Sequence, residues 1–379
     1  MNERTRGAVF AILAGAAWLS AGPALIGQQA EVKTENGIRV VRNPATPVNG
    51  PDGKAAAVAL VEDLVIGNDT GREDHWFGFL NAIDADSSGR IYTVDPKSVR
   101  IRIFGPDGSL VKAFGRKGQG PGEFSGPGGI VAAPDGTFIV SDVLNGRLSR
   151  FSREGAHLKD TLFGTFRLAG LVPDGQGNFY ITNVHPPNGD IQVWDLLKLG
   201  PDMKQIATIH SLSIPFKMRT MPMVPARLFY GMAGPDRLAW MASTAYEITI
   251  VDGSGKPIMR VLKDVMARKV TEADRTAILK DRFPSGAPAQ VEIVFPENFP
   301  AAAGLMIDEK GRIYVRTYET DGKGGAAVDV FDAAGAYVAR FFVPEDEETV
   351  TVRNDKLYVL VKESASGSPL VKRYAMKWD

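Results

Sequence analysis

The sequence predicts an all-β protein: a six-bladed β-propeller of four-stranded antiparallel blades, closed by an N-terminal strand and carrying one short helical insertion. Two internal repeats and the arrangement of the chain ends support this prediction. The first repeat is a tight turn followed by a β-rich run, and most of its copies lie about 40 to 50 residues apart. The turn residues of its six copies are Gly89, Gly136, Gly177, Asp236, Gly311 and Asp355.

A second turn closes five of the six units. It lies at Gly108, Gly155, Met203, Gly255 and Gly335, and its first copy reads Pro-Asp-Gly. Asp-Gly between alternating apolar residues is a strong hairpin signal, because glycine accepts the positive φ that a tight turn demands. Each unit therefore reads as strand, turn, strand, loop, strand, turn, strand, which is the pattern of one propeller blade.

The chain ends predict how the ring closes. After Asp355 only two β-rich runs remain, 356–361 and 370–376, with 349–352 before them, so the sixth unit lacks its outer strand. The segment 58–67 is similar to the strand that ends the first unit. Pairing this segment into the last blade would remove the open sheet edge of an unclosed ring.

One segment has a helical pattern instead. Thr271 is suited to cap a helix, acidic residues follow it, and the run ends before Pro284. This pattern predicts a helix over 271–282, inside an insertion at about 264–298. The expected organisation is a signal peptide over 1–30, an N-terminal extension over 31–56 and the propeller over 57–379.

The first thirty residues predict export. Arg4 and Arg6 precede an apolar run over 8–26, which is the layout of a secretory signal. Glycines and Pro23 interrupt this run, which barely reaches the ~20 residues that a spanning helix needs. Cleavage is therefore favoured over an uncleaved anchor, although no small-x-small cleavage site is well formed. We expect a periplasmic or secreted protein with no membrane span beyond the signal segment.

Composition limits the classes of function. The chain has no cysteine, which excludes disulfides, thiol catalysis and cysteine-ligated zinc. Lys plus Arg and Asp plus Glu each total 44, so the formal net charge is +0. No overall field would draw such a protein onto nucleic acid or an anionic membrane, and no nucleic-acid partner is expected. The protein is expected to be a monomer.

An acidic residue, an arginine and an aromatic residue recur at identical offsets in the first two units. The two copies are Asp95, Arg100 and Phe104, and Asp142, Arg147 and Phe151, and the glycine-rich stretch 115–124 separates them. This pattern resembles NHL-repeat propellers of the exported bacterial type, with the stretch as their inter-blade connector. The resemblance covers about 80–379 as architecture, whereas its motifs lie within 83–151.

The same motifs have structural and functional interpretations. Because the Asp and Arg recur in successive blades, we favour carboxylates that hold their own loops, or that pair with the adjacent arginine, over a catalytic acid and base. The glycine-rich stretch lacks the Gly-Lys-Ser/Thr of a phosphate loop, so we interpret it as a connector.

The histidines decide whether a metal enzyme is plausible. Peptidyl-amidoglycolate lyases resemble this architecture and hold zinc with three histidines near the axis. This chain has His75, His157, His185 and His210, of which His157 falls in an outer hairpin and His210 in an outer strand or its exit. Two histidines fall short of a catalytic zinc site, so no catalytic residue, metal site or cofactor is predicted.

A binding site is expected on one face of the ring. The loops that enter each inner strand gather there with the loops between the second and third strands, and we call this side the entry face. Arginines beside aromatic residues suit an anionic, aromatic or sugar-like ligand or a protein partner, although the aromatic residues could instead pack between blades. The candidate ligand-binding residues are His75, Trp76, Arg116, Arg167, His185, Arg227, Tyr230 and Phe299.

We therefore expect a non-enzymatic module that binds a protein or small ligand at the entry face. The alternative is a metal-dependent lyase or hydrolase that uses the axial pocket, with His75 or His185 as base or ligand. A third interpretation is an assembly platform in an envelope complex.

Overall fold

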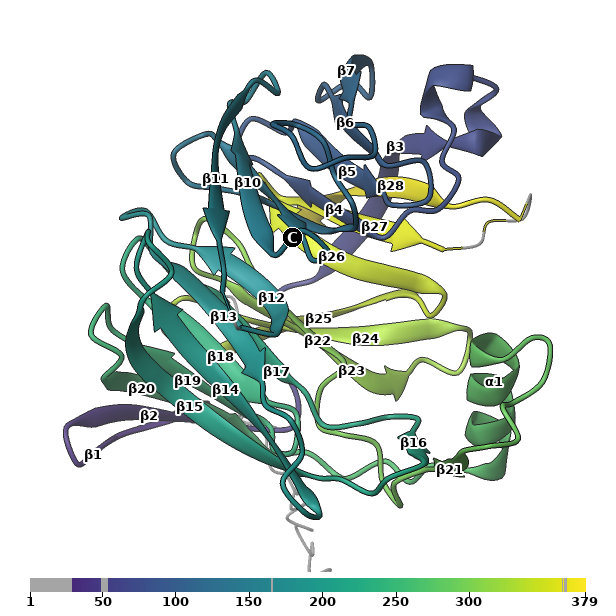
Figure 1. The fold of residues 1–379 in the computed structure, drawn as a ribbon. Helices are drawn as coiled ribbons and strands as arrows, with labels where there is room; N and C mark the ends of the chain where they lie inside the picture. Colours follow the sequence, from purple (N-terminus) through teal and green to yellow (C-terminus); the bar gives the residue numbers. More distant parts are fainter. Residues whose placement is uncertain (1–28, 49–53, 165, 363, 365–366) are drawn as a thin grey trace, which may run out of the picture.

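The computed structural model describes residues 29–48, 54–164, 166–362, 364 and 367–379. Six four-stranded antiparallel units stand around a common axis as the blades of a closed propeller (Figure 1). This confirms the predicted fold class. No helix in these described ranges is long and apolar enough to cross a membrane.

The first three blades are continuous in sequence. Blade one holds β4 (Ala82–Ala85), β5 (Ile91–Asp95), β6 (Arg100–Phe104) and β7 (Leu110–Phe114). Blade two holds β8 (Pro127–Ala132), β9 (Phe138–Asp142), β10 (Arg147–Phe151) and β11 (His157–Leu162). Blade three holds β12 (Leu168–Pro173), β13 (Phe179–Val184), β14 (Ile191–Leu199) and β15 (Gln205–Pro215).

The last three blades follow the same order, from the inner strand to the outer strand. Blade four holds β17 (Leu228–Met232), β18 (Leu238–Ala242), β19 (Glu247–Val251) and β20 (Pro257–Lys263). Blade five holds β22 (Gly304–Ile307), β23 (Ile313–Thr320), β24 (Gly325–Phe331) and β25 (Tyr337–Pro344). Blade six holds β26 (Glu347–Arg353), β27 (Lys356–Val361), β28 (Leu370–Trp378) and β3 (Val58–Gly67).

Ring closure occurs as the sequence predicts. β3 pairs antiparallel with β28 along its whole length, from Gly67 opposite Leu370 to Val58 opposite Trp378. The N-terminal strand thus supplies the outer strand of the last blade, and the ends of the propeller are joined by a full ladder of backbone hydrogen bonds.

In blades one, three and five the repeated turn is built by an aspartate that precedes the glycine by three residues. Asp86 accepts hydrogen bonds from the backbone N–H groups of Ser88 at 2.8 Å and Arg90 at 3.1 Å. Asp308 repeats this in blade five, with the N–H groups of Lys310 and Arg312 both at 2.9 Å. The carboxylate satisfies the backbone of the turn while the glycine provides its positive φ.

The described residues 31–48 and 54–57, which precede β3, lie along the outside of blades four and five. β1 (Glu31–Glu35) and β2 (Ile38–Asn43) make a hairpin, and β2 pairs in parallel with β20. The chain then follows the edge of β25, where the Val48 N–H donates to the Tyr337 carbonyl at 2.8 Å and Ala56 pairs with Ala339. We call residues 31–48 and 54–57 the N-terminal belt, an element that the sequence did not predict.

The connection between blades four and five carries the predicted helix. α1 (Glu272–Arg282) begins after Thr271, whose side chain accepts from the Asp274 N–H in a capping box. β16 (Thr220–Pro222) and β21 (Glu292–Val294) form a short parallel ladder beside it. Two 3₁₀ turns, η1 (Asn68–Thr70) and η2 (Glu73–His75), lie between β3 and β4.

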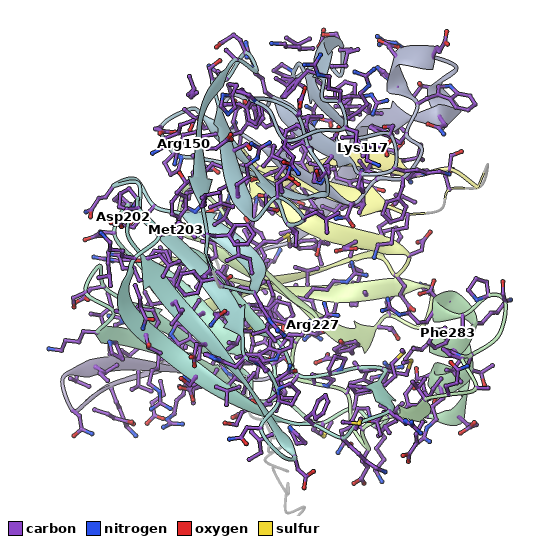
Figure 2. The ribbon with its side chains drawn as sticks, viewed as in Figure 1. Lys117, Arg150, Asp202, Met203, Arg227 and Phe283 are labelled. Carbon is purple, nitrogen blue, oxygen red and sulfur yellow. The ribbon has the colours of Figure 1, made fainter. Side chains whose placement is uncertain are left out.

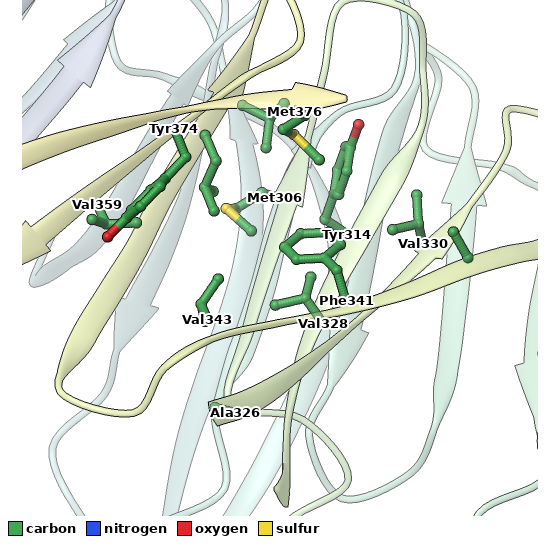
Figure 3. Close-up of a cluster of buried hydrophobic side chains, with 13 residues drawn as sticks. Met306, Tyr314, Ala326, Val328, Val330, Phe341, Val343, Val359, Tyr374 and Met376 are labelled. Atoms are coloured by element: carbon green, nitrogen blue, oxygen red, sulfur yellow. The ribbon is translucent and has the colours of Figure 1, made fainter. Parts of the chain in front are cut away.

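An apolar cluster fills the space between each pair of neighbouring blades. Figure 3 shows the cluster between blades five and six, where Met306, Tyr314, Phe341 and Tyr374 converge from both sheets. Since each blade buries both faces in this way, the ring is one rigid scaffold for the loops of its two faces.

Candidate functional site

The repeated aspartates hold the entry loops, which confirms their structural interpretation. Asp95 accepts from the N–H groups of Gly78 at 2.8 Å and Ser98 at 3.1 Å, and Asp142 accepts from the Gly126 N–H at 2.8 Å. Asp142 forms an ion pair with Arg147 at 3.8 Å, as expected. Asp95 forms its ion pair with Arg102, also at 3.8 Å, and not with the expected Arg100.

The glycine-rich connector is tied to blade two through its carbonyl groups. The Arg147 guanidinium donates to the carbonyl oxygens of Gln119 at 2.8 Å, Gly120 at 3.0 Å and Glu123 at 2.7 Å. A phosphate loop would instead aim its N–H groups at an anion. The connector therefore has the structural role that its sequence predicts.

Exposed apolar side chains gather on the entry face. Most of the large apolar side chains that are exposed in the described residues lie in its loops or at the strand ends beside them. Trp76 is 56% exposed and Leu144 is 75% exposed. None lies in the described tight turns of the opposite face. The members on the entry face are Trp76, Phe79, Val143, Leu144, Leu162, Ile191, Met218, Val265, Met266 and Val294.

A groove of about 570 Å³ opens on the same face, beside α1. Its walls come from three segments: the chain before β17, the helix α1 and the connection between β25 and β26. In Figure 2, Arg227 and Phe283 mark the entry side and Asp202 and Met203 the opposite side. We call this the insertion groove, lined by Met221, Pro222, Met223, Pro225, Arg227, Ala277, Ile278, Asp281, Arg282, Glu345 and Asp346.

A small core of its own supports the groove. Val224, Val270 and Phe299 are buried together, with Met223 and Ile278 packed against them. The β16–β21 ladder and an ion pair of 2.8 Å between Lys217 and Glu292 connect the two chain segments. The walls of the groove are thus held by packing and by backbone hydrogen bonds.

Arg268 fastens α1 to blade five. Its guanidinium donates to Asp274 in the first turn of the helix at 2.6 Å and to the Tyr318 carbonyl at 3.0 Å. It also lies 4.5 Å above the ring of Phe299, which stacks on Tyr318 at 4.7 Å. Phe299, a predicted ligand contact, is therefore a buried support beneath the groove.

Arg227 is the predicted residue that faces the groove. Its side chain is exposed and donates to no acceptor within the described part of the chain, while its backbone pairs with Ser243. Burial raises the pKa of Tyr318, and the nearby charges of Arg227 and Arg316 oppose that rise. The positive charge of Arg227 therefore lies near enough to Tyr318 to favour ionisation of its phenol.

The other predicted residues are dispersed. His75 is only 2% exposed and packs edge-on against Phe104 at 5.4 Å. Tyr230 lies between blades three and four, with its hydroxyl 3.4 Å from the Ala169 carbonyl, and burial raises its pKa to about 12. Neither side chain faces the groove, because both complete the packing of the ring.

The remaining candidates lie on other parts of the entry face. Arg116 is exposed but pairs with Glu123 at 2.6 Å, and Arg167 is exposed beside blade three. Trp76 belongs to the connection from blade six to blade one. The structure therefore places Arg227 on the groove and Phe299 in the small core that supports it. Arg167 and His185 both lie at blade three, where Asn183 contacts each of them.

The histidines are spread over the molecule as well. His185 pairs with Asp195 at 2.7 Å, His157 pairs with Asp160 at 2.9 Å, and His210 stacks on Trp240 at 4.1 Å. In the ranges that the structure describes, no three His, Asp or Glu side chains are grouped so that they could hold a metal ion.

Sequence reasoning missed most of the groove. Met221 and Met223 belong to the run Met-Pro-Met-Val-Pro, and Glu345 and Asp346 connect two blades. The Met- and Pro-rich run next to a predicted insertion was the available signal, because such a run has no place in a blade strand.

Comparison with known proteins supports the fold and not a function. No family model and no curated protein matches the chain. A candidate exported protein from Bacteroides fragilis superimposes with a TM-score of 0.54 at 10% identity, covering 89% of this chain and 99% of that chain.

Other solved structures are more distant. A member of the DUF4221 family from Bacteroides vulgatus gives a TM-score of 0.46 at 12% identity, over 85% of this chain and 98% of that chain. A streptogramin B lyase gives 0.42 at 9% identity, over 85% and 88%. What this chain shares with the Bacteroides fragilis protein is the propeller architecture.

Proposed function

We propose that this protein is an exported, NHL-like propeller that binds a segment of a protein partner at its entry face, without catalysis. The observation that carries this proposal is the number of exposed apolar side chains on that face, which also carries the insertion groove. Apolar surface of this kind marks interaction sites on soluble proteins.

The groove suits a flexible apolar segment. Met221 and Met223 are unbranched and polarisable, so they can adjust to the shape of an inserted side chain. Pro222 and Pro225 restrict the backbone of the same wall, which lowers the entropy lost on binding. Trp76 and Arg227 belong to the residue types that most often dominate protein interfaces.

Charges on the groove specify the polarity of the partner. Arg227 lies on one wall, and Glu345 and Asp346 lie at the connection between blades five and six. The groove would fit a partner segment that has an apolar anchor. This segment would place an acidic side chain near Arg227 and a basic side chain near Glu345 and Asp346. Complementary charges of this kind fix orientation and speed association more than they add affinity.

Residues 1–28 of the predicted signal peptide over 1–30 lie outside the described residues, and a signal of this kind would direct the protein to the periplasm or outside the cell.

Arg227→Glu tests the proposal by reversing the charge on the groove. Affinity purification from extracts of the source cells should recover a partner with the wild type and lose it with this variant. Truncating a dominant interface residue costs about 2 kcal/mol or more, so an affinity loss of about thirtyfold is expected. The matched control is Arg237→Glu, an equally exposed arginine on the opposite face.

Equal recovery with wild type, Arg227→Glu and Arg237→Glu would contradict the site assignment. Melting temperatures of all three proteins show whether each is folded before the comparison is made.

A further inference from the structure

The outer strand of each blade has an edge that another strand could extend, and five of the six blades protect theirs. β2 covers β20, and the N-terminal belt follows β25. Lys112 lies in β7, Lys159 and Asp160 lie in β11, and Glu62 and Asp63 lie in β3. Charged side chains on edge strands discourage pairing with other chains, as does a covering segment.

In the part of the chain that the structure describes, β15 has neither a charged side chain nor a covering segment, although Pro215 at its end donates no backbone hydrogen bond. It is the longest outer strand, with eleven residues, and it contains no Asp, Glu, Lys or Arg. Within the described residues it pairs only with β14, so its other edge is free. A long, uncharged edge strand rich in Ile, Leu and Ser is the kind of edge to which an extended chain adds.

The exposed part of this edge is regular and held in place. Residues 210–215 pair with 191–196 without a register shift, whereas irregularities occur nearer the start of β15. His210 stacks on Trp240 of blade four, and Ser211 donates to Asp195 at 2.6 Å. A rigid edge loses little conformational entropy when a second strand pairs with it.

We propose that β15 pairs antiparallel with β15 of a second copy of this protein, joining two blades into one continuous sheet. A register centred on Leu212 places it opposite its symmetry mate and sets Ser211 opposite Ser213, so the same surface serves both copies. The strand has no charge to repel its copy, and the formal net charge of the whole chain is +0. This dimer uses the outer edge of blade three and not the insertion groove, and it replaces the monomer expected from the sequence.

The dimer is expected to be weak and reversible. Stable interfaces bury about 1,600 Å² in total, and one pair of edge strands covers less than this. Dimers should therefore appear only as concentration rises.

Sedimentation velocity over about 1 to 200 µM tests the proposal, since mass action makes a weak dimer concentration-dependent. The dimer fraction should increase for the wild type and fall at least tenfold for Ser213→Glu, which places an acid near Ser211 and Asp195 of the other copy. The matched control is Ala113→Lys in β7, a strand whose edge already carries a charge. It should dimerise as the wild type does.

Hydrogen exchange provides a second readout that needs no variant. Amides of 210–214 should gain protection as the wild-type concentration rises, while those of β7 should not. A protein that is monomeric throughout would overturn the proposal. So would a dimer that Ser213→Glu leaves intact, protection that increases elsewhere, or irreversible aggregation in place of a reversible equilibrium.

Discussion

At the scale of single residues, burial changes what a side chain can do. His75 lies in a loop of the entry face, which is why the sequence makes it a candidate ligand. In the structure its ring is buried, with Nδ1 3.3 Å from the Thr70 hydroxyl, and Nε2 has no hydrogen-bond partner among the residues that the structure describes. His75 therefore contributes to the stability of the fold and not to ligand binding.

The position of His75 predicts a pH effect. Burial, with a smaller effect of Arg72, lowers the pKa of His75 below its usual value. As pH falls through the unfolded pKa of about 6.5, the unfolded chain takes up a proton first and the native state loses relative stability. In His75→Gln, the free energy of unfolding should fall less between about pH 7 and pH 5 than in the wild type.

Urea unfolding at a series of pH values measures this difference. Above about pH 8 the histidine is neutral in both states, so any offset there reports packing alone and serves as the internal control. Parallel pH profiles for the two proteins would contradict the prediction.

At the scale of elements, the N-terminal belt depends on Asn43. Its side chain donates to the carbonyls of Leu262 at 3.2 Å and Gly335 at 2.9 Å, and it accepts from the Tyr337 N–H at 2.8 Å. One amide thus joins β2 to blades four and five. Loss of the side chain would leave these three backbone groups without the Asn43 partner.

Asn43→Ala should destabilise the protein by about 2 to 4 kcal/mol, because buried backbone groups lose their partners. Urea unfolding checks the magnitude. Hydrogen exchange should show the same loss concentrated in β2 and at the edge of β25. Arg42→Ala is the control, since Arg42 is the exposed neighbour and makes only a 3.4 Å ion pair with Glu35. Equal destabilisation by Asn43→Ala and Arg42→Ala would mean that the Asn43 side chain does not hold the N-terminal belt on blades four and five.

At the scale of the whole molecule, the N-terminal belt and β3 stabilise different parts of the propeller. The belt covers blades four and five, whereas β3 completes blade six and closes the ring. A protein that starts at residue 57 should keep the propeller with a lower melting temperature. One that starts at residue 68 should leave the edge of β28 open and aggregate or fail to fold.

Circular dichroism, melting curves and size-exclusion chromatography distinguish these outcomes. If the chain that starts at residue 68 is monomeric and as stable as the one that starts at residue 57, closure by β3 is not what holds the ring together.

Local patterns determined most of the architecture. The repeated turns predicted six blades because the backbone conformation of a tight turn depends on residues next to one another, such as Asp86 and Gly89. The same holds for α1, whose cap lies within four residues of sequence. The closing strand was predictable because it fills the one place that the repeat count left empty.

Only the tertiary structure decided the belt, the groove and the burial of His75. Asn43 and Tyr337 meet across 294 residues, and three separate segments line the insertion groove. Even within a repeat, Asp95 pairs with Arg102 in place of Arg100. These features depend on which surfaces meet once the blades have packed, and a turn or strand pattern contains no information about its distant neighbours.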